Sequence, residues 1–204
     1  MFLANSFFRP GPWARWGLWL VFLVAYAGGL RAIIEHRRVT LVGVVLTAVI
    51  VVLRTPGVTA HWRMPGDIAA LVFLTFLAGS VFADVIRTRD VTIDTVFGAC
   101  TVYLTLGLLW AVIYTMLEAT HPGSFNSVTH AGDLASRDEL LPQFVYYSFI
   151  TLATVGYGDI TPVSQEARGL AMLEAILGQL YIAIMIARLV GLQVARGLQD
   201  RTRS

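Results

Sequence analysis

Residues 151–162 read TLATVGYGDITP, and this stretch decides how the rest of the chain is interpreted. Two glycines, Gly156 and Gly158, stand one residue apart with a tyrosine between them, and an aspartate follows. Such a stretch is a poor helix, because each interior glycine costs about 1 kcal/mol relative to alanine. It nevertheless lies between two strongly apolar segments, 142–153 and 169–191. The sequence therefore predicts an irregular loop between helices that are embedded in a membrane.

The composition is that of an integral membrane protein. Of the 204 residues, 56% are hydrophobic and only 14% are charged, whereas soluble domains carry about 25% charged residues. Crossing a bilayer takes about 20 apolar residues as a helix. Five runs meet or approach that length: 16–34, 39–53, 68–86, 91–117 and 169–191. We predict an all-α membrane protein with about five transmembrane helices.

The charged residues indicate orientation and exclude one class of partner. The 15 basic residues are all arginines, and a net charge of +2 is too small to suggest nucleic acid. Arginines gather between the apolar runs, where lipid headgroups would meet them. By the positive-inside rule, the arginine-bearing segments 31–38, 87–90 and 188–204 lie in the cytoplasm, which places loop 118–138 outside. We expect a multi-pass protein of the plasma or inner membrane.

The apolar stretch 142–153 is too short to span a membrane. Its 12 residues reach about 18 Å as a helix, which suits a re-entrant segment, and Pro142 fits the first helical position. Irregular backbone at membrane depth, such as the loop that follows, is tolerated only where protein buries it or where it lines a water-filled path.

Alternating glycines allow successive carbonyl groups to point the same way, because glycine adopts positive φ without a steric penalty. A column of carbonyl oxygens can replace the hydration shell of an alkali cation, whose burial without ligands would cost tens of kcal/mol on a Born estimate. One chain supplies only one side of such a column. The loop therefore predicts a symmetric homotetramer with four loops around one axis.

The segment 154–159, TVGYGD, resembles the selectivity filter of prokaryotic potassium channels, for which the TVGYG loop is the standard example. It stands between an outer helix (91–117), a short pore helix (142–153) and an inner helix (169–191), which is the helix–pore loop–helix plan of that family. The resemblance covers about half the chain. It implies passive, potassium-selective conduction, with K⁺ ions in the filter and no other cofactor.

Two other readings stay open beside this one. A weakly selective monovalent cation channel would carry a similar loop, and so would a non-conducting regulatory subunit. An enzyme is not expected, because no run pairs a nucleophile with a base or shows the ligand spacing of a metal site.

The resemblance assigns roles to the residues of the loop. Gly158 would allow the outward turn, and Asp159 at the external mouth would raise the local cation concentration. The family's ion sites are backbone carbonyls together with one threonine hydroxyl. They correspond here to the carbonyls of Thr154, Val155, Gly156 and Tyr157 and the hydroxyl of Thr154.

The resemblance also bears on the pore helix. Tyr146 and Tyr147 fall where the family often has an aromatic pair that braces the filter, and ordinary interfacial tyrosines are the alternative. Ile150 stands where some bacterial relatives have a glutamate that pairs with the aspartate of the mouth. That pairing is therefore absent from this chain.

The inner helix carries one acid, Glu174, well inside an apolar run, which makes it a functional-site hypothesis. It would either face the cavity and attract cations or lie behind the filter, hydrogen-bonded to the pore helix. Gly178, one turn later, falls where the family often has a gating hinge. Three further residues have a spacing that would line the cavity: Gln179, Ile182 and Ile186.

We divide the chain into an N-terminal membrane module (1–90), a pore domain (91–193) and a short basic tail (194–204). The runs of the module lack arginines at every third residue, as a voltage sensor would require. The sequence also offers no recognisable ligand-binding domain. The module is expected to pack on the pore domain, sense lipid or bind another membrane protein.

Overall fold

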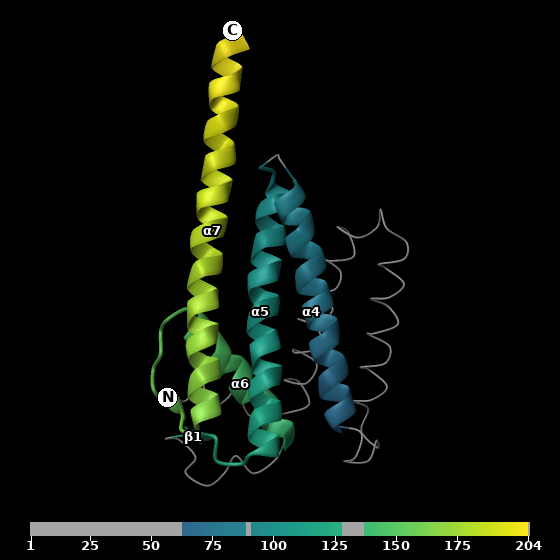
Figure 1. The fold of residues 1–204 in the computed structure, drawn as a ribbon, viewed down its shortest axis with the longest axis vertical. Coiled ribbons are helices and arrows are strands. Elements are labelled where there is room, and N and C mark those ends of the chain that lie inside the picture. The colour runs from purple at the N-terminus through teal and green to yellow at the C-terminus, as the bar shows by residue number, and fades with distance from the viewer. Residues whose placement is uncertain (1–62, 89–90, 128–136, 204) are drawn as a thin grey trace, which may run out of the picture.

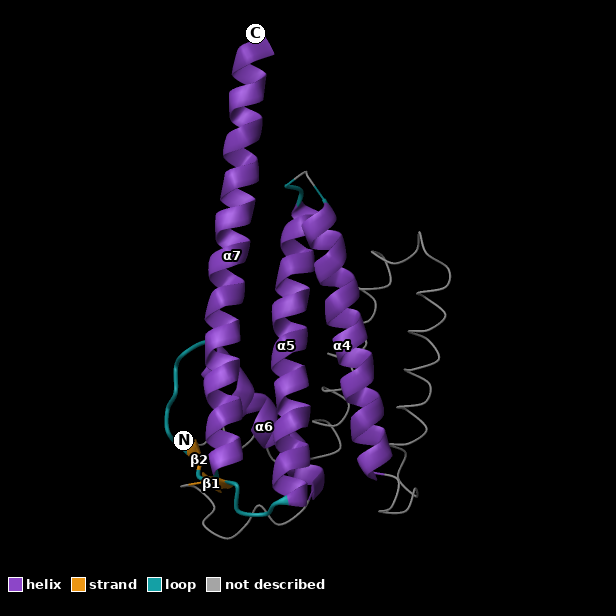
Figure 2. Cartoon of the chain, viewed as in Figure 1, coloured by secondary structure: helices purple, strands orange, loops and turns teal. Residues whose placement is uncertain are grey.

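The structure is a computed structural model that describes residues 63–88, 91–127 and 137–203. Within these residues three helices are long and apolar enough to cross a membrane: α4 (Arg63–Arg87), α5 (Ile93–Thr120) and α7 (Gln165–Arg203). A shorter helix, α6 (Arg137–Leu152), lies between the lower halves of α5 and α7 (Figure 2). The prediction of a helical membrane protein is confirmed. The spans predicted at 16–34 and 39–53 lie outside the described residues.

Helices α4 and α5 run antiparallel and lie side by side (Figure 1). Thr92 caps α5 at its N-terminus in a capping box, where its hydroxyl accepts from the Thr95 amide and the Thr95 hydroxyl accepts from the Thr92 amide. Each of these bonds satisfies a donor that the first helical turn leaves unpaired. This cap explains why α5 begins just after the predicted start of the run.

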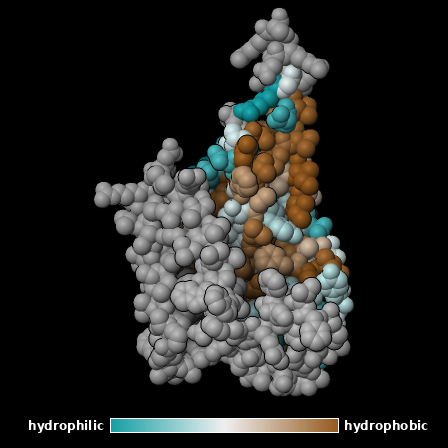
Figure 3. Space-filling view, turned by 180° about the vertical axis from the view of Figure 1, so that it is seen from behind, coloured by the Kyte–Doolittle hydropathy of each residue, from teal (hydrophilic) through white to brown (hydrophobic). Residues whose placement is uncertain are grey.

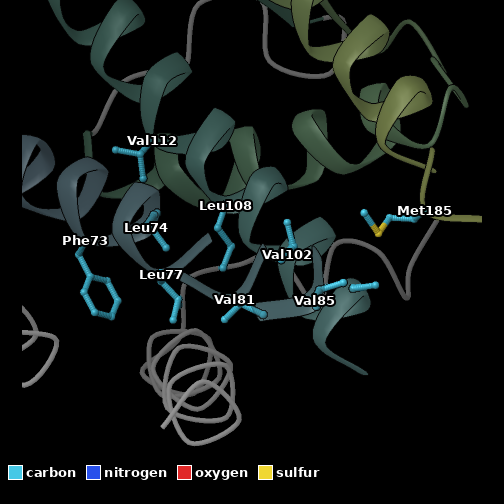
Figure 4. Packing of buried hydrophobic residues seen from close by; sticks show 10 residues of the cluster. Phe73, Leu74, Leu77, Val81, Val85, Val102, Leu108, Val112 and Met185 are labelled. Atoms are coloured by element: carbon cyan, nitrogen blue, oxygen red, sulfur yellow. The ribbon is translucent and has the colours of Figure 1, made fainter. Parts of the chain in front are cut away.

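One hydrophobic cluster, the α4–α5 core, joins these two helices and receives one side chain from α7 (Figure 4). Lipid tails are as apolar as these side chains, so van der Waals packing between the two helices favours this contact inside a bilayer. The third predicted run is thereby packed against the pore domain. The buried members are Phe73, Leu74, Leu77, Val81, Val85, Ala99, Val102, Leu108, Val112 and Met185.

Helix α6 starts earlier than predicted. Pro142 was expected at its first helical position, but the helix begins at Arg137 and Pro142 lies inside it. The expectation was wrong because a proline in the second turn removes only the bond to the carbonyl four residues before it, so a preceding turn can still form. Its 16 residues reach about 24 Å, which still falls short of a bilayer of about 30 Å.

The polar segment after α5 holds a strand that the sequence did not predict. β1 (Phe125–Ser127) pairs antiparallel with β2 (Ile160–Pro162), the segment that directly follows the TVGYGD loop. The buried Glu118 of α5 holds the turn before β1, because its carboxylate accepts from the Gly123 amide (2.8 Å) and the Phe125 amide (3.1 Å). The outer loop and the exit of the glycine loop are therefore one connected unit.

Helix α7 is the longest of the described elements, with 39 residues, or about 58 Å. Ser164 caps its N-terminus by accepting from the Ala167 amide (3.1 Å). The helix extends past the predicted run 169–191 and remains helical to Arg203. Figure 3 shows hydrophobic surface over the middle of the helix bundle and hydrophilic residues nearer the C-terminal end of α7. A series of apolar side chains on α7 is about half exposed in the single chain: Met172, Leu173, Ile176, Leu177, Leu180, Ile184, Ile186, Val190 and Val194.

Candidate functional site

The loop between α6 and β2 has an alternating backbone. Thr154, Gly156 and Gly158 have positive φ values of 57°, 55° and 78°, whereas Val155 and Tyr157 between them do not. Thr154 is the only non-glycine residue with positive φ in the described part of the chain, and that conformation costs roughly 1–2 kcal/mol outside glycine. Alternation of this kind turns successive peptide groups so that their carbonyls face one side and their amides the other.

The amide side of the loop is tied to the end of α6. The Ile150 carbonyl accepts from the Val155 amide (2.8 Å) and from the Gly156 amide (3.2 Å), and the Thr151 carbonyl accepts from the Thr154 amide (3.0 Å). Ile150 was singled out as the position where a family glutamate is absent. Here its side chain is buried and its main chain anchors the loop. The end of α6 thus fixes the loop backbone through main-chain carbonyls.

The other side of the loop is open in the single chain. Residues 153–158 are all exposed, with Val155 49% and Tyr157 72% exposed. A Cβ added at Gly156 or Gly158 would meet no atom within 4 Å. Apolar side chains exposed to this extent beside a rigid backbone indicate a surface that another partner covers.

Tyr146 and Asp159 are in direct contact. The Tyr146 hydroxyl donates to Asp159 Oδ2 (2.7 Å), and Oδ1 accepts from the Ile160 amide (3.0 Å). Burial, and then the hydrogen bond to Asp159, raise the pKa of Tyr146 to about 12. The Tyr146 hydroxyl thus holds the Asp159 carboxylate at the end of the loop.

Tyr147 lies in a different environment from that of Tyr146. It is buried in an aromatic cluster, where its ring packs edge-on against Tyr114 and Phe125 with centroids 5.2 and 5.4 Å apart, and Phe144 completes the group. Edge-to-face pairs of this kind add about 0.5–1.5 kcal/mol beyond their area burial. The two neighbouring tyrosines therefore make different contacts: Tyr146 contacts Asp159, and Tyr147 packs α6 against α5 and β1.

Glu174 lies behind the loop, which is one of the two arrangements that the sequence allowed. Its side chain is fully buried between α5, α6 and α7. The Tyr114 hydroxyl lies 2.5 Å from Oε2, and the Ser148 hydroxyl lies 2.5 Å from Oε1 and 2.8 Å from the Gly107 carbonyl oxygen. The acid joins three helices and is not aimed at the exposed side of α7.

The remaining inner-helix residues separate into two groups. Gly178 is buried, and a Cβ there would lie 2.9 Å from Leu152 Cδ2 and 3.3 Å from the Leu152 carbonyl oxygen, so the glycine permits close approach to the end of α6. The helix runs unbroken through this position. Gln179 and Ile186 are exposed and Ile182 is half-buried, and their spacing places them on one face of α7.

Sequence reasoning missed the partners of Glu174. Tyr114 and Ser148 are polar residues inside apolar helices, and Gly107 is the glycine whose carbonyl contacts Ser148. The only sequence signal was that polarity, because intramembrane polar side chains usually bond across helices. The sequence did not indicate which of these side chains are in contact, because Tyr114 and Glu174 are 60 positions apart.

Two long helices that flank a short helix and an alternating loop form the unit from which membrane pores are built. In agreement, residues 102–193 match the family described as "Ion channel". A protein named LctB from Bacillus caldotenax is 33% identical over 125 residues, which cover 60% of this chain and 90% of the relative. A second LctB, from Geobacillus stearothermophilus, is 33% identical over 108 residues, or 53% of this chain and 79% of the relative.

The chain belongs to this potassium channel-like family of ion channels. It is therefore a membrane protein of the ion channel type, and membership in such a family points to transport rather than catalysis.

Proposed function

We propose that the protein is a potassium-selective channel that conducts K⁺ passively through a homotetrameric pore. The observation that supports selectivity most directly is the alternating φ at Thr154, Gly156 and Gly158. Such alternation allows the carbonyls of residues 154–157 to face the side of the loop that the single chain leaves exposed. Backbone carbonyls in a column are the ligands with which potassium pores replace the hydration shell.

The exposed surfaces support an assembly of four chains. Val155 and Tyr157 are apolar or aromatic and uncovered, and so is the apolar side of α7. Heterologous contacts around a closed axis bury the same surfaces in every copy. In such a tetramer, Asp159 lies at the outer mouth, and Gln179, Ile182 and Ile186 line the cavity below the filter. Gly178 remains the proposed hinge.

The module upstream of the pore completes the proposed topology. We place five spans in the plasma or inner membrane, with the N-terminus outside and the tail 194–204 in the cytoplasm. Residues 1–90 form the membrane module, and lipid surrounds it. α4 supports this arrangement, because its apolar length suits a span and it packs along α5.

The full chain, purified and reconstituted in liposomes, tests the proposal. We expect K⁺ flux down its gradient, Na⁺ flux at least about tenfold slower, and a particle mass of four chains. Equal K⁺ and Na⁺ fluxes would leave a weakly selective cation channel. The absence of flux from correctly assembled tetramers would leave a non-conducting subunit.

A further inference from the structure

Three buried polar side chains meet where the pore helix crosses the outer and inner helices. Glu174 of α7 and Ser148 of α6 are 0% exposed, and so is Tyr114 of α5. Glu174 lies 2.5 Å from each of the two hydroxyls, and Ser148 Oγ lies 2.8 Å from the Gly107 carbonyl oxygen. The filter chemistry described above does not use this cluster.

The single hydrogen of the Ser148 hydroxyl points to one direction for these bonds. A serine hydroxyl carries one hydrogen, and a carbonyl oxygen can only accept. The contact between Ser148 and Gly107 is therefore a hydrogen bond only if Ser148 donates to the carbonyl. Ser148 Oγ must then accept from its other neighbour, Glu174 Oε1, which requires a proton on that oxygen. Tyr114 donates to Oε2, so all three contacts are satisfied in one direction.

The surroundings of Glu174 agree with a neutral acid. The ionisable groups that face it are tyrosines: Tyr103 and Tyr114 of α5 and Tyr147 of α6. Among the described residues no arginine forms an ion pair with it. A buried carboxylate without a cation is costly, and a buried carboxylic acid with both oxygens hydrogen-bonded is not.

From this geometry we infer that Glu174 is a protonated carboxylic acid that positions the filter from behind, by donating to Ser148 while accepting from Tyr114. The inference rests on the proposed function, since it assigns a role in filter selectivity. Glu174 does not contact the conducted ion. It acts through α6.

The path from Glu174 to the filter is short. Ser148 lies two residues before Ile150, whose carbonyl holds the Val155 and Gly156 amides. One turn along α7 from Glu174, Gly178 packs against Leu152 at the end of α6. Fixing Ser148 to both α5 and α7 therefore fixes the carbonyl that sets the filter backbone. If α6 shifts, the Ile150 carbonyl and the two amides that it holds shift with it.

Replacing Glu174 with glutamine distinguishes a positioning role of this side chain from a role of its negative charge. In the Glu174→Gln variant, the side-chain amide would donate through its NH₂ group to Ser148 and accept from Tyr114 through its oxygen, as the protonated acid does. We expect this variant to retain the K⁺ over Na⁺ flux ratio of the wild type within about twofold. Glu174→Ala and Ser148→Ala each remove a buried hydrogen bond, and should lower the ratio by about tenfold.

An infrared measurement tests the protonation state without relying on conduction. The wild-type protein in lipid should show a carboxylic acid C=O band at neutral pH that Glu174→Gln removes. Absence of this band overturns the inference, and so does a Glu174→Gln variant that fails to assemble or loses selectivity as Glu174→Ala does.

Should Glu174→Ala fail to fold, Ser148→Ala and Tyr114→Phe decide the same question, because wild-type selectivity in both excludes the positioning role. If the wild type shows the band but does not select K⁺ over Na⁺, the proposed function and the positioning role of Glu174 are both overturned. The protonated state of Glu174 would still stand.

Discussion

The positive φ values at Thr154, Gly156 and Gly158 are the residue-level feature on which the geometry of the loop depends. Alanine at Gly156 would strain the backbone at a φ of 55° and favour an ordinary conformation that turns one carbonyl away. We expect Gly156→Ala to abolish selective K⁺ flux in liposomes, at a cost of about 1–2 kcal/mol per chain.

Gly123 provides a matched control for this substitution. It also has positive φ, 89°, and an added Cβ there would likewise meet no atom within 4 Å, but it lies in the turn before β1. Gly123→Ala should carry a similar backbone strain and retain selectivity. Equal loss of selectivity in both variants would show that general instability, not carbonyl direction, explains the effect.

The contact between Tyr146 and Asp159 should be sensitive to strongly alkaline pH. Its pKa is raised from 10.0 to about 12 by burial and by the hydrogen bond to Asp159. Because the folded pKa exceeds the unfolded one, the stabilisation is complete below pH 10 and is lost as pH rises toward 12. The thermal unfolding temperature of the wild type should therefore fall more steeply over that interval than that of Tyr146→Phe, which lacks the hydroxyl. Parallel curves would contradict this assignment.

Replacing each of the two buried glutamates with glutamine should change the stability of the protein to different extents. Glu118 accepts from two backbone amides, so the NH₂ group introduced by Glu118→Gln would face an N–H donor and leave it unpaired. We expect Glu118→Gln to cost about 1–3 kcal/mol. Glu174→Gln should be nearly neutral, because the hydroxyl oxygen of Ser148 can accept from the new NH₂ group. Thermal unfolding in detergent checks both, and equal destabilisation would contradict the proton assignment at Glu174.

At the scale of elements, Gly107 sets how closely α6 approaches α5. A Cβ there would lie 2.7 Å from Phe149 Cε1 and 2.8 Å from its Cζ, so the ring would have to move. Overpacking of this kind costs about 1–3 kcal/mol, which exceeds the gain in helix propensity of up to about 1 kcal/mol. Gly107→Ala should lower both thermal stability and the K⁺ over Na⁺ flux ratio, because Gly107 also accepts from Ser148.

Gly79 of α4 serves as the control for Gly107. It is also a helical glycine, but an added Cβ meets nothing within 4 Å. Gly79→Ala should be neutral or stabilising by about 0.5–1 kcal/mol. A Gly107→Ala variant as stable as Gly79→Ala would show that Phe149 moves without cost.

The elements also show where sequence reasoning succeeds. The apolar runs for α4, α5 and α7 were recognisable because a bilayer demands long apolar stretches. The glycine loop stood out because TVGYG resembles the filter sequence of potassium channels. The start of α6 before Pro142 and the pairing of β1 with β2 were not predicted. Hydrophobic periodicity encodes neither feature. The early start of α6 depends on tolerance of the one helical hydrogen bond that Pro142 removes. The strand pairing depends on partners 35 residues apart, such as Asn126 and Thr161.

At the scale of the whole molecule, Arg188 ties the helix before the pore to the inner helix. Its Nη2 donates to the Ile86 carbonyl (2.8 Å) and to the Thr88 carbonyl (2.7 Å) at the end of α4. Carbonyls in the last turn of a helix lack intrahelical partners, and a cation there also complements the helix dipole. Arg188 lies 14 residues beyond Glu174, about 21 Å along α7, so this contact is remote from the filter.

We therefore expect Arg188→Ala to loosen α4 without changing ion selectivity. Losing charge-assisted bonds to two carbonyls should cost about 1.5–3 kcal/mol, seen as faster hydrogen exchange in the last turn of α4. Arg188→Lys, which retains the charge but lacks the planar fork, should fall between the wild type and Arg188→Ala. The K⁺ over Na⁺ flux ratio should stay at the wild-type value in both variants. If selectivity fell together with α4 protection, the helix before the pore would be part of the filter's support, and the separation between residues 1–90 and the pore domain would have to be abandoned.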